Sequence, residues 1–284
     1  MLVELAVGDA YGAGFEYVWN RKFVSAHNDL SAYVRHPWHK QKPGTYTDDT
    51  QMSIAIAELV VEGGDWSPLR LAEKFVEVFQ RDPRRGYSKQ FYAFLKKIKD
   101  GATFLANIRP ASEKSGAAMR AAPIGVYASI EEVIEKSTVQ ASVTHDTPAG
   151  IHAAVAASLM AHYFLYGLGP KSELPVFLSE HVSGDWQTPW LGEVGSQGLM
   201  SVRAALTSVL KHDAMSAILK SCIAWMGDTD TVAAIAMAVA SCCSEIERDL
   251  PEHLIKGLEK GTYGRAFLGE LDGALMRGSK MVKG

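Results

Sequence analysis

The sequence predicts an all-α protein folded as one compact helical bundle. Three observations favour this class: apolar residues recur at helical spacing along most of the chain, two segments are apolar on nearly every side, and no segment keeps the alternation of a strand. The 284 residues are 47% hydrophobic and 21% charged, which is an ordinary globular composition. Because no linker rich in Pro, Gly or Ser divides the chain, we expect a single domain over residues 1–284.

The amphipathic helices carry recognisable start and stop signals. Ser67 and Pro68 provide a cap and a first-turn proline for one helix. Ser88 caps the next helix, and Gly101 lies just past its predicted end. By the same signals and by apolar spacing, the remaining helices are predicted at residues 130–139, 147–167, 199–210, 214–226, 251–258 and 265–276.

Two segments, residues 49–61 and 231–244, are apolar on nearly every side. A helix with that pattern is buried on every side, so we expect both segments to lie in the middle of the bundle. The longest apolar run, at 231–243, is too short to cross a bilayer as a helix. We therefore expect no membrane partner.

Charge and cysteine content indicate a protein of a reducing compartment without a nucleic-acid partner. The formal net charge is −3, whereas a nucleic-acid-binding face would normally be basic. The short cluster of Arg81, Arg84 and Arg85 is interpreted as a solvated helix end. The 3 cysteines form no paired motif, and the N-terminus has no basic, apolar leader. These features predict a cytoplasmic location.

Both buried segments open on threonine and aspartate residues. One such residue is usually a helix N-cap, but each opening offers more carboxylates than capping needs. Two like charges about 4 Å apart repel by about 4 kcal/mol at an effective dielectric of about 20, and burial adds to that cost. Mg²⁺ or Mn²⁺, which prefer hard oxygen ligands, would remove it. Because the sequence leaves the distance between Asp48 and Asp228 undetermined, capping and metal binding both stay open.

Several motifs occur in the order typical of a known family. Residues 7–16 read VGDAYGAGFE, and residues 47–52 read TDDTQM. Residues 115–125 read SGAAMRAAPIG, residues 227–231 read GDTDT, and the Thr-His pair at 144–145 is a weaker match. With these motifs in this order, the chain resembles the ADP-ribosylglycohydrolases, which include the dinitrogenase reductase-activating glycohydrolases.

The resemblance implies a compact all-α domain around two Mg²⁺ or Mn²⁺ ions that hydrolyses the glycosidic bond of ADP-ribosyl groups. The implied partners are ADP-ribosylated proteins or ADP-ribosyl small molecules. The implied metal ligands are Thr47, Asp48, Asp49, Asp228, Asp230 and Thr231. The implied catalytic residues, among which the sequence does not choose a proton carrier, are Asp48, Asp49, Asp228 and Glu16. The implied substrate contacts, in a loop that meets the diphosphate and at a histidine near the ADP-ribose, are Ser115, Gly116, Ala117, Met119 and His145.

The chain departs from the family pattern in the loop that meets the diphosphate, where Lys114 also replaces a small residue and substrate choice is affected, and at the start of the last motif. Ser115 stands where the family usually has Asn, and Met226 stands where the last motif usually begins with Gly. Because the implied metal ligands are intact, we expect activity. The alternatives are a non-catalytic ADP-ribose-binding or structural homologue and an all-α metal-dependent nucleotide phosphohydrolase. The acceptor linkage (Arg, Ser or nucleobase), the preferred metal and the oligomeric state are not determined by the sequence.

Other conspicuous side chains are interpreted as structural. Asp9 lies in a motif that packs a helix start. His36 and His39 flank a Pro-Trp pair, a pattern typical of a loop rather than of a metal site. Trp186 and Trp190 are expected in a packed surface loop.

Overall fold

A computed structural model describes residues 1–280 of the protein, and in this part of the chain the fold is all-α, as predicted. Within these residues the β-type contacts are isolated bridges, and no strand is formed. The helices are α1 (Leu2–Gly12), α2 (Arg21–His27), α3 (Asp48–Glu62), α4 (Pro68–Arg81), α5 (Lys89–Lys97), α6 (Gly101–Asn107), α7 (Ile130–His145), α8 (Pro148–Tyr166), α9 (Leu174–His181), α10 (Gly198–Lys211), α11 (Met215–Ala224), α12 (Thr229–Ala240), α13 (Glu252–Gly257) and α14 (Arg265–Lys280). Short 3₁₀ turns are η1 (Ser115–Ala117), η2 (Ala122–Val126) and η3 (Lys171–Glu173).

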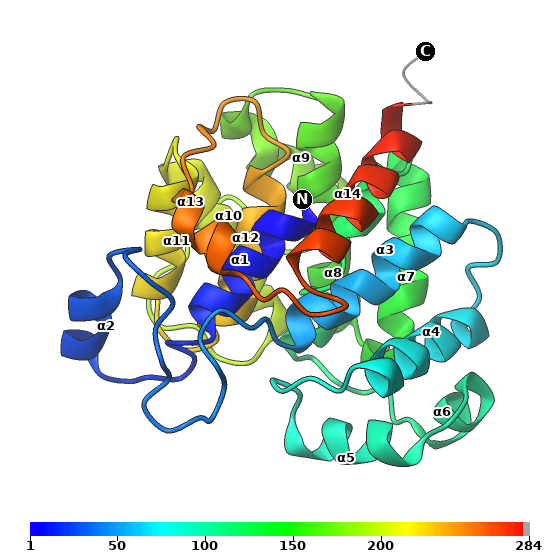
Figure 1. Ribbon diagram of the computed structural model, residues 1–284. Coiled ribbons are helices and arrows are strands. Elements are labelled where there is room, and N and C mark those ends of the chain that lie inside the picture. The colour runs from blue at the N-terminus through cyan, green and yellow to red at the C-terminus, as the bar shows by residue number, and fades with distance from the viewer. Residues whose placement is uncertain (281–284) are drawn as a thin grey trace.

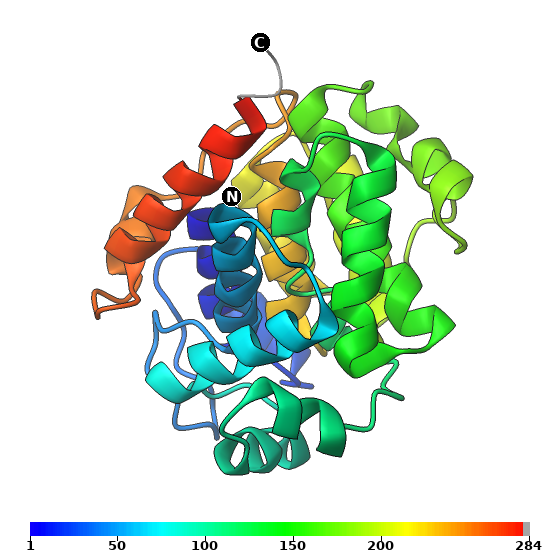
Figure 2. The same ribbon diagram turned by 90° about the vertical axis from the view of Figure 1, so that its right-hand side faces the viewer.

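The two apolar segments form the middle of the bundle, which confirms their predicted burial except at their C-terminal ends, where Val61 and Ser244 are exposed. Every residue of α12 is buried, and α3 is buried from its first residue to Ala57. Figure 1 shows α1 beside α12, with α3 next to them. In the turned view of Figure 2, α7 and α8 stand together as a second wall of the bundle. The N-terminal ends of α3 and α12 thus meet inside the protein, close to the end of α1.

Glycine allows α1 and α12 to approach each other closely. A Cβ atom added at Gly12 would lie 2.5 Å from the Cα atom of Asp230, and one added at Gly8 would lie 2.5 Å from the carbonyl oxygen of Ala233. Such distances are far inside van der Waals contact, so any larger side chain would push the helices apart. The contact therefore fixes where the first turn of α12 lies relative to α1.

We expect Gly12→Ala to destabilise the protein by about 1–3 kcal/mol, the usual cost of overpacking a core. The matched control is Gly269→Ala in α14, where an added Cβ meets nothing within 4 Å. Because alanine favours helix more than glycine does, the control should be neutral or stabilising. Urea unfolding of both variants measures the difference. Equal stability of the two variants would contradict the close helix contact.

Several helix boundaries differ from the prediction. Gly101 does not end a helix but begins α6, because the Asp100 side chain caps that helix through Thr103 N. The helix predicted at 130–139 continues to His145. The core helix predicted to reach residue 244 ends at Ala240, since the amides of Cys242 and Cys243 form tighter bonds three residues back. The short helices α2, α6 and α9 were not predicted, because so few residues show little periodicity.

The arginine cluster is less solvated than predicted. The Arg84 guanidinium pairs with Asp82 and Glu259 and lies 3.9 Å from the centre of the Tyr46 ring. Arg81 pairs with Glu58, so Arg85 is the most exposed member of the cluster. Two of the three arginines, Arg81 and Arg84, are thus paired with carboxylates of the protein, although the sequence suggested that all three would face water.

One helix, α8, is long and apolar enough by length and composition alone to cross a membrane. In this structure, 72% of its apolar window is buried inside the bundle. It contacts α7, α10 and α12, which is typical of the core helix of a globular protein. Packing inside the bundle therefore accounts for the length and apolar composition of α8.

Candidate functional site

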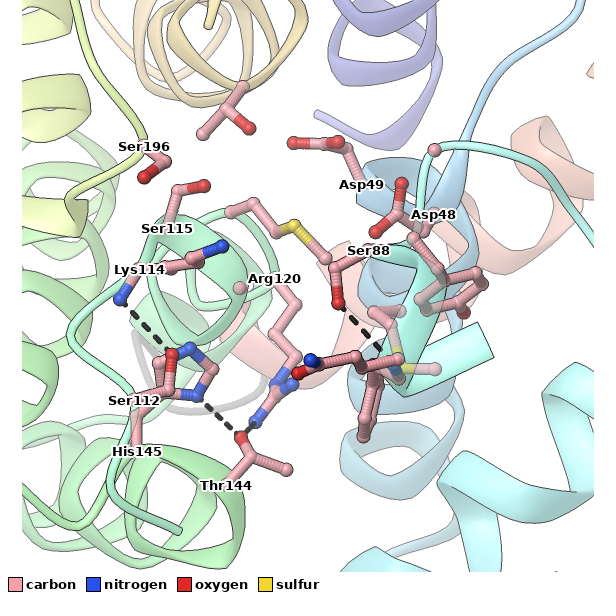
Figure 3. A pocket seen from close by; sticks show the side chains of 18 of the residues that line it. Asp48, Asp49, Ser88, Ser112, Lys114, Ser115, Arg120, Thr144, His145 and Ser196 are labelled. Atoms are coloured by element: carbon pink, nitrogen blue, oxygen red, sulfur yellow. Dashed lines mark hydrogen bonds between the residues drawn. The ribbon is translucent and has the colours of Figure 1, made fainter. Parts of the chain in front are cut away.

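Carboxylates from three segments of the chain gather where α1, α3 and α12 meet. Figure 3 shows Asp48 and Asp49 facing the same cavity. Oxygen atoms of Asp9, Asp49 and Asp230 lie within 4.8 Å of one another, as do those of Glu16, Asp228 and Asp230. We call this group the acidic cluster; its members are Asp9, Glu16, Asp48, Asp49, Asp228 and Asp230. The fold thus brings the two acidic helix openings together, which the sequence alone left undetermined.

Capping does not account for these aspartates. The N-cap of α3 is Thr47, whose side chain accepts from the amide of Asp49. The Asp9 carboxylate supports the same helix end by accepting from the backbone and hydroxyl groups of Thr47 and Thr50. By contrast, Oδ1 of Asp49 is buried without a hydrogen-bond partner in residues 1–280, and Asp228 forms no side-chain cap on α12. A buried carboxylate oxygen without a partner is costly unless a cation or a donor reaches it.

A tight turn sets Asp228 at the edge of the cavity. Met226 and Gly227 both adopt left-handed backbone angles, with φ of 63° and 84°. A Cβ atom at Gly227 would lie 1.8 Å from the carbonyl oxygen of Val194, which accepts from the amide of Asp228. Glycine adopts left-handed angles more readily than methionine does. The angle at Met226 therefore explains why the family pattern usually has glycine at this position.

Burial dominates the electrostatics of the acidic cluster. Removal from water raises the pKa of Asp48, Asp49 and Asp230 well above the usual value, and neighbouring carboxylates raise it further. Burial also raises the pKa of Glu16 to about 8. Within residues 1–280, none of the lysine or arginine ion pairs involves a member of the cluster. Protons or cations must therefore balance this charge.

The metal-free protein is expected to lose stability as the pH rises from 6.5 to about 8. In that range the folded chain holds protons on Glu16, whose pKa burial raises to about 8, and the unfolded chain has already released them. Raising the pH therefore favours unfolding. Below pH 6.5, buried histidines such as His145 act in the opposite direction, because burial lowers their pKa. Urea unfolding in excess chelator at a series of pH values measures the slope, which Glu16→Gln should reduce. Stability that rises across this range would contradict the account.

The acidic cluster closes one end of a cavity of about 490 Å³. A polar wall is formed by the loop at residues 112–116 and by the end of α7 with Thr144 and His145. An apolar wall is formed by Tyr87 and the α5 side chains Phe91 and Phe94. The cavity therefore joins acidic, polar and aromatic surfaces in one space.

Most of the predicted site residues line this cavity. They are Glu16, Asp48, Asp49, Ser115, Gly116, Met119, His145, Asp228, Asp230 and Thr231. Two others do not line it. Thr47 is buried behind the cluster as the α3 cap, and Ala117 is buried with its carbonyl oxygen accepting from the side-chain amide of Gln140. The Thr47 hydroxyl and the Ala117 carbonyl are thus engaged within the protein.

The polar loop is tied both to the acidic cluster and to α7. The amide of Ser115 donates to Ser196 O at 3.0 Å. Burial raises the pKa of Asp228, and the nearby side chain of Ser115 partly offsets that rise. A Cβ atom at Gly116 would lie 3.0 Å from Cε1 of His145, so only glycine fits there without displacing the ring. Ser115 therefore lies beside the acidic cluster as well as in the loop that the resemblance places at the diphosphate of the substrate.

Some lining residues were missed by sequence reasoning. Arg120 lies in a quoted motif, but its spacing does not reveal that the guanidinium is buried and 1% exposed. Tyr17 directly follows Glu16 and lines the cavity from a left-handed backbone position with φ of 51°. Phe91 and Phe94 lie on the helix that Ser88 was predicted to cap, and no signal in the sequence shows that one side of this helix, α5, faces a cavity.

The histidine loop has structural partners. His36 Nε2 donates to the carbonyl oxygen of Glu16 at 2.8 Å, while its Nδ1 accepts from the amides of Trp38 and His39. Both ring nitrogens are thus occupied, and the loop holds the backbone of the segment that carries Glu16.

The comparisons with known proteins point to a single family. A sequence model of the ADP-ribosylglycohydrolase family matches residues 1–280. The ADP-ribosylhydrolase ARH3 of Xenopus tropicalis is 30% identical over 189 residues, which cover 62% of this chain and 53%, about half, of that relative. The ADP-ribosyl-[dinitrogen reductase] glycohydrolase of Rhodospirillum rubrum is 24% identical over 270 residues, covering 90% of this chain and 87% of the relative.

Two further similarities agree with these. The ADP-ribosylarginine hydrolase Tri1 of Serratia proteamaculans is 24% identical over 257 residues, covering 84% of this chain and 69% of the relative. A solved structure described as an ADP-ribosylglycohydrolase-related protein complex superposes with a TM-score of 0.76 at 21% identity, covering 98% of this chain and 96% of that chain. At that identity the superposition supports the fold alone.

Proposed function

Because the chain belongs to the ADP-ribosylglycohydrolase family, we propose that it is a metal-dependent hydrolase that cleaves the bond between ADP-ribose and an acceptor. The observation that carries this proposal is the acidic cluster, which is buried at one end of a cavity of about 490 Å³. Cavities of roughly 300–1,000 Å³ are typical of small-molecule sites, and a nucleotide-sized group fits that range. The acceptor is an ADP-ribosylated protein side chain such as Arg or Ser, a nucleobase or a small molecule.

The residues of the acidic cluster fit divalent cations. Their donors are hard oxygen atoms, and Oδ1 of Asp49 has no hydrogen-bond partner among residues 1–280. We propose that Asp48, Asp49, Asp228 and Asp230 hold two Mg²⁺ or Mn²⁺ ions, with the hydroxyls of Thr47 and Thr231 beside them. When bound, such ions supply positive charge that polarises substrate oxygens and lowers the pKa of water.

The remaining surfaces of the cavity suit the rest of an ADP-ribosyl group. The hydroxyl-rich ribose next to the acceptor would lie at the acidic cluster. Backbone groups near Ser115 and Gly116, with the ring of His145, would face the diphosphate. The aromatic side chains of Phe91 and Phe94 offer faces on which a base can stack.

Hydrolysis breaks the bond between the anomeric carbon and the acceptor atom, adds a water oxygen to that carbon, and returns a proton to the acceptor. We propose that Glu16 takes the proton from the attacking water. Its carboxylate lies within 4.8 Å of those of Asp228 and Asp230, beside which the ions would be held, and its burial favours the protonated form once a proton has been taken up.

Product identity tests this function. The protein is incubated with Arg-, Ser- and nucleobase-linked ADP-ribose in the presence of Mg²⁺ or Mn²⁺, and the products are separated by chromatography. Free ADP-ribose is expected with at least one linkage. Release of phosphate or a nucleoside monophosphate would instead indicate a nucleotide phosphohydrolase, and no product from any linkage would indicate a non-catalytic homologue.

We also propose that residues 1–284 act as one domain in the cytoplasm. The described cysteines, Cys222, Cys242 and Cys243, form no disulfide with one another, which fits a reducing compartment. Intact-mass measurement of the protein purified without reductant, with and without alkylation, tests whether the thiols stay reduced.

A further inference from the structure

A buried arginine is connected to the cavity through a short series of hydrogen bonds. Nε of Arg120 donates to Oε1 of Gln140 at 2.7 Å, and Nη2 donates to the hydroxyl of Thr144 at 2.9 Å. That hydroxyl lies 2.7 Å from Nδ1 of His145. Figure 3 shows the two links to Thr144 side by side, with the imidazole facing the cavity. We call Arg120, Thr144 and His145 the relay.

The guanidinium has no carboxylate partner in the described part of the chain. It is 1% exposed, lies 4.3 Å from the centre of the Phe75 ring, and is held by the side chain and backbone oxygens of Gln140. The Gln140 side chain is itself fixed, because its amide donates to Ala117 O at 3.0 Å. A buried cation in such a rigid frame orients whatever accepts its remaining protons.

The chemistry of these groups sets the direction of each proton. A guanidinium can only donate, so the Thr144 hydroxyl accepts from Arg120. A threonine oxygen can accept two hydrogen bonds, but within residues 1–280 the Thr144 hydroxyl has no acceptor for its own proton other than Nδ1 of His145, so that proton is directed there. Nδ1 must therefore be the unprotonated nitrogen of the ring, and the proton of the neutral imidazole lies on Nε2.

The other edge of the imidazole faces the polar loop at residues 112–116. A Cβ atom at Gly116 would lie 3.3 Å from Nε2 and 3.0 Å from Cε1 of His145. His145, Thr144 and Arg120 all line the cavity. Burial, with the charge of Arg120, also lowers the pKa of His145 to about 3, so the ring stays neutral at physiological pH.

We propose that Arg120, acting through Thr144, is a positioning residue that fixes His145 as the neutral Nε2–H tautomer, a donor for a substrate oxygen. The consequence is that His145 binds substrate and does not carry protons during turnover, because its basic nitrogen is occupied by Thr144. This inference rests on the proposed function only for the identity of the substrate.

Nitrogen-15 NMR tests the tautomer without any turnover. Two-bond proton–nitrogen spectra of the full chain at pH 7 distinguish protonated from unprotonated ring nitrogens, and His145→Gln identifies the His145 signals. The wild type is expected to show a protonated Nε2 and an unprotonated Nδ1. Thr144→Val should lose the single tautomer, and Thr144→Ser should retain it. A wild-type ring protonated on Nδ1, or on both nitrogens, would overturn the proposal.

Kinetics separate positioning from a merely structural role. Removing one hydrogen bond of this kind should raise KM for an ADP-ribosyl substrate roughly 5- to 10-fold in Thr144→Val, with kcat within about 2-fold. Thr144→Ser should keep the wild-type KM. The matched control is Thr138→Val, because the Thr138 hydroxyl donates only to Ile134 O of its own helix. Equal KM values for the Val and Ser variants at position 144 would contradict the relay. NMR measures the tautomer of His145 without any turnover. An incorrect tautomer assignment can therefore be distinguished from an absence of hydrolysis.

Discussion

Asp48→Asn and Asp49→Asn are each expected to lower kcat for ADP-ribose release at least roughly 100-fold, the scale of losing one electrostatic contact at a reaction centre. Both side chains line the cavity, and in the described part of the chain no hydrogen-bond donor reaches Oδ1 of Asp49. An amide keeps the size of the carboxylate but loses the charge that would bind a divalent cation. Initial rates at saturating substrate and metal measure the effect, and circular dichroism checks that the helices remain.

The control for these variants is Asp100→Asn. The Asp100 side chain caps α6 through Thr103 N at 2.7 Å and lies at the surface. Asparagine caps a helix nearly as well as aspartate, so this variant should keep wild-type turnover. If Asp48→Asn and Asp49→Asn behave like Asp100→Asn, the aspartates of α3 have no part in catalysis.

Asp230→Asn is expected to change stability in opposite directions with and without metal. Without cations, burial raises the pKa of Asp230 well above its usual value, and the neighbouring carboxylates of Glu16, Asp49 and Asp228 raise it further. Removing one charge relieves repulsion that costs on the order of a few kcal/mol for a close pair, so in chelator the variant should melt at or above the wild-type temperature. With saturating Mg²⁺ or Mn²⁺, the wild type should gain stability by mass action and the variant much less.

Thermal melts of both proteins, each in chelator and in metal, measure this crossover. Loss of a helix cap cannot produce it, because capping does not depend on the cation; Asp100→Asn in the same four-way comparison should show no crossover. If metal raises the melting temperatures of wild type and Asp230→Asn equally, Asp230 is not a ligand.

The helices that matter most could be predicted from residue patterns. Residues 49–61 and 231–244 are apolar all round, and this pattern correctly places α3 and α12 in the core. The clusters of aspartate at their openings indicate where charge is concentrated. Helix type and burial are local consequences of composition, which explains why a single sequence suffices for them.

The meeting of the two openings could not be predicted from spacing. It depends on the approach of α1 to α12 at Gly8 and Gly12, and close contacts between distant segments leave no local signature. The relay was missed for a similar reason. An arginine is usually exposed, and the burial of Arg120 is compensated by Gln140 and Thr144, one turn apart on α7, which accept its protons. Motif matching likewise could not show that Thr47 and Ala117 lie behind the cavity surface.

Titration of stripped protein with Mn²⁺ tests the central claim most directly, with bound ions counted by equilibrium dialysis and ADP-ribose release followed in the same samples. The claim is that the acidic cluster holds the cations on which hydrolysis depends. We predict no release without Mn²⁺, a rise in rate that follows occupancy and levels off near two ions per chain, and reversal by chelator. Full ADP-ribose release from protein with no bound ion would contradict the account.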